Sequence, residues 1–124
     1  MSAVRGNKIK LVFRQRTWRV MTGLTLLFLA IGWAVSLWRF PPLAGEGDIL
    51  PLHYNIYFGV DAVGPWWRIL VIPGFATLAF LLNLLMMTAK QTDDSVRVML
   101  LGITSLLVAL LCDVALVFIL LANL

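Results

Sequence analysis

The stretch that decides the fold is "RVMLLGITSLLVALLCDVALVFILLAN", residues 97–123, a continuous apolar run that contains one acidic residue, Asp113. A helix rises about 1.5 Å per residue, so this run is long enough to cross a hydrocarbon core about 30 Å thick. Two further apolar runs, about 18–40 and 66–89, reach the same length. The sequence therefore predicts an all-α fold: an integral membrane three-helix bundle.

The composition supports the same class. The chain has 124 residues, of which 61% are hydrophobic and only 13% are charged, whereas soluble domains average about 45–50% apolar and about 25% charged residues. We expect a basic tail over 1–17 and a single membrane domain over 18–124. The apolar core of a cleavable signal peptide is only about 7–15 residues long, so the longer first run is expected to remain as an anchor.

Lysine and arginine predict the orientation, because positive flanks tend to stay on the cytoplasmic side. Six of them precede residue 20, and Lys90 and Arg97 flank the connection between the second and third runs. We expect a protein of the cytoplasmic (inner) membrane with its N-terminus inside, the loop 41–65 outside and its C-terminus outside. Anionic headgroups would attract the tail at about 1 kcal/mol per charge, and nucleic-acid binding is not expected. The tail residues concerned are Lys8, Lys10, Arg14 and Arg16.

Small residues mark the faces through which membrane helices pack, because burial of apolar side chains gains little in lipid. Each run has such residues at helical spacing, so each helix is expected to have one close-packing face, and the remaining faces meet lipid or a partner. The predicted faces are Gly102, Ser105, Ala109 and Cys112/Asp113 in the third run, Pro73, Ala76, Ala79 and Asn83 in the second, and Gly23, Ala30 and Ala34 in the first.

Asp113 is the most unusual residue, since a carboxylate at the centre of a bilayer costs about 2.5–3.5 kcal/mol. Its depth corresponds to Ser36 in the first run and Pro73 in the second, counted at about 1.5 Å per residue. Three roles remain open: a hydrogen bond within the bundle, a proton or ion relay, and a salt bridge to a partner subunit. The candidate partners for the hydrogen bond are Ser36, a carbonyl freed by Pro73, and Arg68 or His53 from the outer loop. Asn83 lies too far toward the cytoplasm to reach Asp113 and is expected to form an interhelical hydrogen bond.

The outer loop, about residues 41–65, is expected to be ordered but without a sheet. Pro41 and Pro42 end the first helix, and an isolated extended piece near residues 50–58 would have no strand to pair with. Trp66 and Trp67 are expected at headgroup depth, where indoles are enriched.

Catalysis and metal binding find little support in the sequence. The chain has one histidine, His53, and one cysteine, Cys112, whereas a catalytic zinc takes three protein ligands and a water. No serine lies near His53, so no nucleophile–histidine pair is evident. We therefore predict no catalytic residues, no metal site and no cofactor.

The loop sequence "LPLHYNIYFGVDAVG" resembles the short signature of the Sdp-immunity family, in which a Pro-x-His-aromatic-Asn stretch followed by Gly and Asp lies in the first outer loop of a multi-pass protein. Tyr54 stands where that family usually has tryptophan. The resemblance implies an outward-facing motif in a small relative of that family. The matching residues are Pro51, His53, Tyr54, Asn55, Gly59, Asp61 and Gly64.

Two functional hypotheses follow. The first is a non-enzymatic inner-membrane protein that acts as an accessory, immunity-like or sensory component through its outer loop, within a homo-oligomer or with a larger membrane protein. The second is a subunit of a small transporter or proton-coupled channel with Asp113 on the pathway. Assembly is expected in both cases, because three helices alone enclose no useful cavity.

Overall fold

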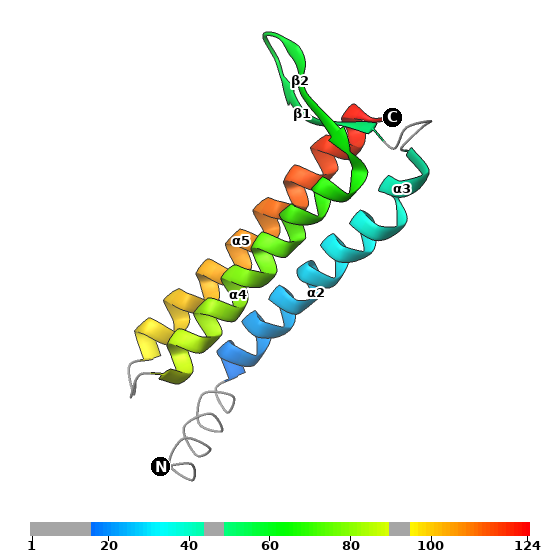
Figure 1. Ribbon diagram of the computed structural model, residues 1–124. Helices are drawn as coiled ribbons and strands as arrows, with labels where there is room; N and C mark the ends of the chain where they lie inside the picture. The colour runs from blue at the N-terminus through cyan, green and yellow to red at the C-terminus, as the bar shows by residue number, and fades with distance from the viewer. Residues whose placement is uncertain (1–15, 44–48, 90–94) are drawn as a thin grey trace.

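Three long helices lie side by side in the computed structural model, which describes residues 16–43, 49–89 and 95–124 (Figure 1). They are α2 (Arg16–Trp38), α4 (Val71–Ala89) and α5 (Ser95–Ala122). Each belongs to a helical segment that is long and apolar enough to span a membrane. The three predicted helices are thus confirmed, with bounds that differ from the expected ones by a few residues.

The first long helix ends just before Pro41 and Pro42, as expected. α2 ends at Trp38, before both prolines, and Pro41 and Pro42 lie in the short helix α3 (Phe40–Leu43). Pro73 likewise lies in the first turn of α4. Proline is tolerated in a first turn because the N–H groups there have no partner within the helix. Pro41 and Pro42 have no N–H to donate to the carbonyl oxygens of the last turn of α2, which is consistent with the predicted end of the first helix.

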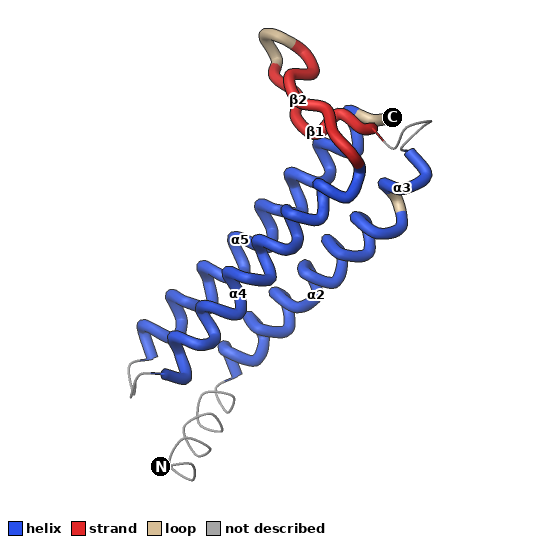
Figure 2. The backbone as a smooth tube through the Cα atoms, viewed as in Figure 1, coloured by secondary structure: helices blue, strands red, loops and turns tan. Residues whose placement is uncertain are grey.

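The outer loop contains a β-hairpin, so the all-α prediction is wrong at this point. β1 (Ile49–Asn55) pairs antiparallel with β2 (Gly59–Pro65), and the hairpin extends from one end of the bundle (Figure 2). The expectation of an ordered loop without a sheet is wrong because residues 59–65 supply a second strand. The turn has three residues, 56–58, followed by Gly59 at φ +75°, a left-handed conformation that glycine adopts without strain and that closes such hairpins.

α5 holds the bundle together, because it packs extensively against both α2 and α4, which contact each other less. The small residues predicted for its packing face are confirmed. Gly102 and Ala109 are buried, and a Cβ atom added at Gly102 would stand 3.4 Å from Trp18 Cζ3 of α2. Glycine at this position lets the two helices approach closely.

The packing face predicted for α2 is wrong. Gly23, Ala30 and Ala34 are all exposed. The buried face uses larger and more polar side chains as well as one glycine, at helical spacing, so residue size alone does not locate it. The buried residues of α2 are Trp18, Thr25, Leu29, Gly32 and Ser36.

The core forms three layers along the bundle. Trp18, Met87 and Val98 meet at the end away from the hairpin. Leu29, Ala76, Phe80 and Ala109 meet in the middle. The layer next to the hairpin joins four elements through Phe40, Leu50, Ile69 and Leu116.

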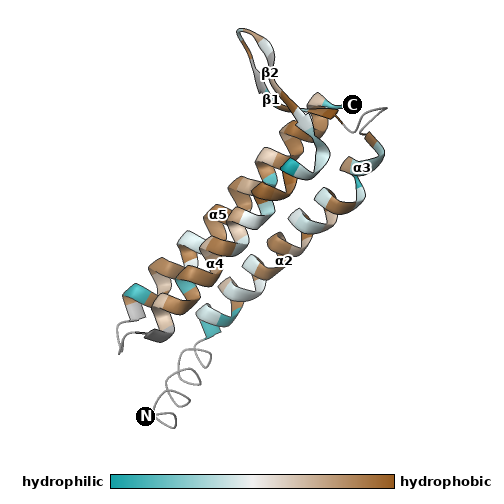
Figure 3. Ribbon diagram, in the orientation of Figure 1, coloured by the Kyte–Doolittle hydropathy of each residue, from teal (hydrophilic) through white to brown (hydrophobic). Residues whose placement is uncertain are grey.

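Most apolar side chains of the helices nevertheless point outward, and Figure 3 shows apolar residues along the whole length of the bundle. Within an apolar 18-residue window of each candidate span, only 22%, 22% and 17% of the residues are buried. Soluble monomeric proteins do not expose so large an apolar surface to water. The remaining area therefore needs an apolar environment, either lipid or a protein partner.

Candidate functional site

The hairpin is tied to the bundle at its base. Leu50 of β1 is only 2% exposed and packs in the layer with Phe40 and Leu116. The Asn123 side chain, just after α5, donates hydrogen bonds to the carbonyl oxygens of Pro51, at 3.0 Å, and Ile119, at 2.8 Å. The base of the hairpin therefore has a defined position on the end of α5.

The tip of the hairpin is apolar and exposed. Ile56, Tyr57 and Phe58 are 81%, 82% and 84% exposed, respectively. Aromatic side chains are enriched in the cores of protein interfaces and at membrane interfaces. We call these three residues the hairpin tip. Composition alone did not single them out, because it is the turn between β1 and β2 that places them at the exposed end of the hairpin.

The residues of the predicted outer-loop motif lie on both strands. His53 pairs with Ala62, Tyr54 with Val60 and Asn55 with Gly59. Asp61 lies on β2 between Val60 and Ala62, where the register shifts. The His53 side chain is exposed, whereas the side chains of Tyr54, Asn55 and Asp61 lie outside the described part of the structure. The hairpin thus brings the motif's backbone together in one small sheet.

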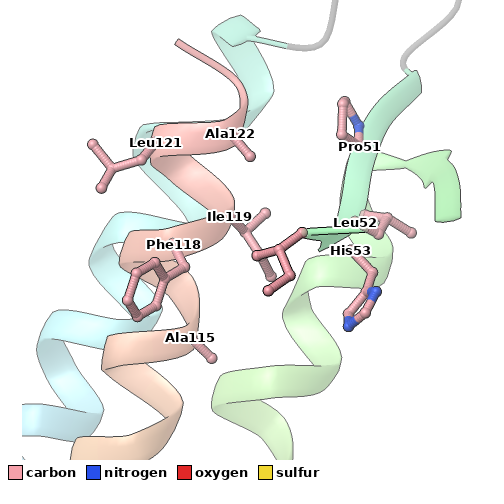
Figure 4. A pocket seen from close by; sticks show the side chains of 9 residues that line it. Pro51, Leu52, His53, Ala115, Phe118, Ile119, Leu121 and Ala122 are labelled. Carbon is pink, nitrogen blue, oxygen red and sulfur yellow. The ribbon is translucent and has the colours of Figure 1, made fainter. Parts of the chain in front are cut away.

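A groove of about 600 Å³ lies between β1 and the last turns of α5 (Figure 4). The strand contributes Pro51, Leu52 and His53, and Ile56 at the tip also lines it. The helix side is apolar throughout and was not anticipated, since the groove exists only because the hairpin folds back beside α5. The lining residues of α5 are Ala115, Phe118, Ile119, Leu121 and Ala122.

A basic side chain lies near Leu52, one of the residues that line this groove. Arg68, in the 3-10 helix η1 (Trp66–Leu70), stacks on the Trp67 ring with its guanidinium carbon 5.9 Å from the ring centroid. A Cβ atom added at Gly64 would stand 3.3 Å from a guanidinium nitrogen of Arg68 and 2.8 Å from Leu52 Cδ1. Arg68 therefore covers Gly64 next to Leu52, one of the groove residues.

Asp113 lies at the contact of all three helices. A Cβ atom added at Gly32 of α2 would stand 2.6 Å from Asp113 Oδ1 and 3.7 Å from Pro73 Cβ of α4. The predicted level beside Pro73 is thus confirmed, and the contact on α2 is Gly32, one turn before Ser36. Gly32 provides the space that the carboxylate occupies, a role that the sequence pattern did not reveal.

The expected hydrogen bond between Asp113 and Ser36 is absent. Ser36 Oγ and Asp113 Oδ2 are both buried and have no hydrogen-bond partner among the described residues. The carbonyl one turn before Pro73, that of Ile69, faces the backbone N–H of Val71. The same N–H also faces the Arg68 carbonyl, so the Ile69 carbonyl oxygen keeps capacity to accept a further hydrogen bond.

Asn83 forms the interhelical hydrogen bonds expected of it. Its Nδ2 donates to Ser105 Oγ of α5, at 2.9 Å, and to the carbonyl oxygen of Leu101, at 3.4 Å. A second bond, between α2 and α4, was not anticipated: Trp33 Nε1 donates to Thr77 Oγ1, at 3.0 Å. Asn83 is thus engaged in helix packing and is not part of the Asp113 site.

The other predicted residues form no chemical site in the described ranges. Lys8, Lys10 and Arg14 lie outside them, and Arg16 is exposed at the start of α2. Among residues 16–43, 49–89 and 95–124, no three His, Cys, Asp or Glu side chains come together to hold a metal ion. The absence of metal, cofactor and catalysis stays a prediction.

No protein-family model, curated protein or solved structure matches the chain. The resemblance of the loop to the Sdp-immunity signature therefore stays a prediction that rests on about fifteen residues.

Proposed function

We propose that the chain is a non-enzymatic, multi-pass inner-membrane protein that recognises a partner through its hairpin, as an accessory, immunity-like or sensory component within an oligomer. The observation that carries the proposal is the exposed hairpin tip on a base held by Leu50 and Asn123. A fixed base with an exposed aromatic end loses little conformational entropy on binding. The resemblance to the Sdp-immunity signature supports the same surface.

The proposed orientation has the tail inside and the hairpin outside, as the charge asymmetry favours. Cysteine labelling tests it directly. In a Cys112→Ala background, a cysteine at position 57 is expected to react with a membrane-impermeant maleimide added to intact cells. A cysteine at position 57 that reacts only after the membrane is opened would contradict this orientation.

Photocrosslinking tests recognition by the tip. A benzoylphenylalanine at position 58 is expected to give one discrete protein adduct in intact cells, and the adduct should disappear with Tyr57→Ser or His53→Ala. Trp38 offers a matched control position, because it is 83% exposed at the same end of the bundle. Adducts with lipid only, or the same adduct from position 38, would contradict recognition by the tip.

A second candidate function is proton or ion coupling, favoured by one observation: Ser36 Oγ and Asp113 Oδ2 are buried on facing helices without hydrogen-bond partners among the described residues. An intramembrane carboxylate is a functional candidate by default. Purified protein in liposomes would then show a flux that Asp113→Asn abolishes while the oligomer persists. Equal flux for both proteins would exclude this function.

A further inference from the structure

The groove between β1 and α5 has the size and polarity of a ligand site. Its volume of about 600 Å³ lies within the range of about 300–1,000 Å³ that is typical of small-molecule sites. Its walls are apolar on the α5 side, and His53 is the only ionisable side chain among the described residues that line it. These walls suit a long apolar chain and offer few polar contacts.

The groove is continuous with the exposed flank of α5. Phe118 and Leu121 line it and are 67% and 60% exposed. Val114 and Val117, nearby on the same helix, are exposed as well. In the membrane-spanning arrangement this flank faces acyl chains, so a lipid can enter the groove sideways without crossing water.

The positive charge of Arg68 favours an anionic headgroup beside Leu52. Arg68 covers Gly64 beside Leu52, and its stacking on Trp67 holds the guanidinium at the level where indoles anchor to headgroups. Guanidinium groups bind phosphate in a bidentate manner. The Arg68 guanidinium, which packs against Gly64 beside Leu52, is therefore the basic group that we assign to the phosphate of a lipid whose acyl chain occupies the groove.

We propose that the groove between β1 and α5 binds one acyl chain of an anionic phospholipid, with the Arg68 guanidinium contacting the lipid phosphate. The proposal rests on the membrane-spanning arrangement but not on partner recognition by the hairpin tip. The two therefore fail separately: loss of lipid binding leaves the crosslink at position 58 unaffected, and the reverse also holds.

Native mass spectrometry of the full chain tests the proposal. The protein is extracted in mild detergent with an equimolar mixture of phosphatidylglycerol and phosphatidylcholine. We expect one retained phosphatidylglycerol per chain. Ala115→Leu, which fills the groove, is expected to lower the retained fraction severalfold, whereas Ala34→Leu, the same change at an exposed position of α2, should leave it unchanged.

Removal of the positive charge of Arg68 tests the contact with the lipid headgroup. Arg68→Gln is expected to reduce the preference for phosphatidylglycerol about fivefold, since one near-surface charge contributes about 1 kcal/mol. Arg39→Gln, an exposed arginine at the same end of the bundle, is the matched control and should keep the preference.

Three results would overturn the proposal. Lipid retention that is equal in Ala115→Leu and Ala34→Leu would show that the acyl chain of the lipid does not occupy the groove. Retention without preference between the two lipids would remove the role of Arg68. A dimer that Ala115→Leu dissociates while lipid retention is unchanged would show that the groove is an interface between copies.

Discussion

Gly32 of α2 faces Asp113 of α5 so closely that a Cβ atom at position 32 would stand 2.6 Å from Asp113 Oδ1. Carbon and oxygen atoms that are not bonded do not approach to this distance, so a side chain at position 32 and the observed carboxylate position exclude each other. The one acidic residue of the three apolar spans is therefore accommodated by a glycine on the neighbouring helix. This contact connects the polar site to the packing of the bundle.

Gly32→Ala is expected to destabilise the protein, because the methyl group forces Asp113 or the helices to move. Overpacking of this kind costs about 1–3 kcal/mol. Gly23→Ala is the matched control, since nothing lies within 4 Å of a Cβ atom there, and alanine should raise stability by about 0.5–1 kcal/mol. Thermal unfolding in mild detergent, followed by circular dichroism, measures both. Equal midpoints for the two variants would contradict the close contact.

Ser36→Ala and Ser105→Ala are expected to change stability in opposite directions, although both serines are buried. Ser36 Oγ has no hydrogen-bond partner among the described residues, so its removal should raise the free energy of unfolding by about 1 kcal/mol. Ser105 Oγ accepts a hydrogen bond from Asn83, so removal of this hydroxyl should lower the free energy of unfolding by about 0.6 kcal/mol. Denaturant unfolding of the detergent-solubilised protein measures the stability of both variants. A lower stability of Ser36→Ala would show that the Ser36 hydroxyl forms a hydrogen bond in the assembled protein.

Asn83 and Ser105 should be energetically coupled across α4 and α5. A double-mutant cycle with alanine at both positions is expected to give a coupling energy of about 0.6 kcal/mol, the average for such bonds in membranes. Thr104 provides the control cycle with Asn83, because its hydroxyl bonds within α5 to the Leu100 carbonyl oxygen and should show no coupling. Coupling of equal size in both cycles would rule out a specific bond.

Asn123→Ala should loosen the hairpin without destabilising the bundle. The substitution removes the hydrogen bond to the Pro51 carbonyl oxygen, while the apolar layer around Leu50 stays intact. Hydrogen exchange followed by mass spectrometry is expected to show faster exchange in residues 49–65 and little change in α2 and α4. Leu124→Ala, an exposed neighbour, serves as the control. Unchanged exchange in the hairpin would mean that Leu50 alone holds it.

Sequence reasoning located the helices well and their contact faces less well. The apolar runs were long enough to predict α2, α4 and α5, because crossing a bilayer imposes a minimum length. The face of α5 was also predicted, since its small residues recur at helical spacing. The face of α2 was not, because its buried side includes Trp18 and Leu29, and the small residues Gly23 and Ala30 point outward.

The hairpin was not predicted either, because strand pairing, like helix packing, depends on contacts between separate segments. The aromatic and β-branched composition near residues 50–58 indicated an extended segment, but its partner strand contains glycines and Pro65, which are weak strand formers. The pairing depends on Gly59 closing a three-residue turn and on Leu50 packing beneath the base. The packing of Leu50 joins segments far apart in the chain, so local propensity could not reveal it.

The sequence by itself determined that three helices form, how long they are and on which of them the one carboxylate of the apolar spans lies, because these properties follow from apolar run length and helix geometry. Only the tertiary structure decided that Gly32 makes room for Asp113, that the loop is a hairpin and that a groove opens beside α5. Each of these depends on which side chains meet between segments far apart in the chain, and packing distances of a few ångströms decide that.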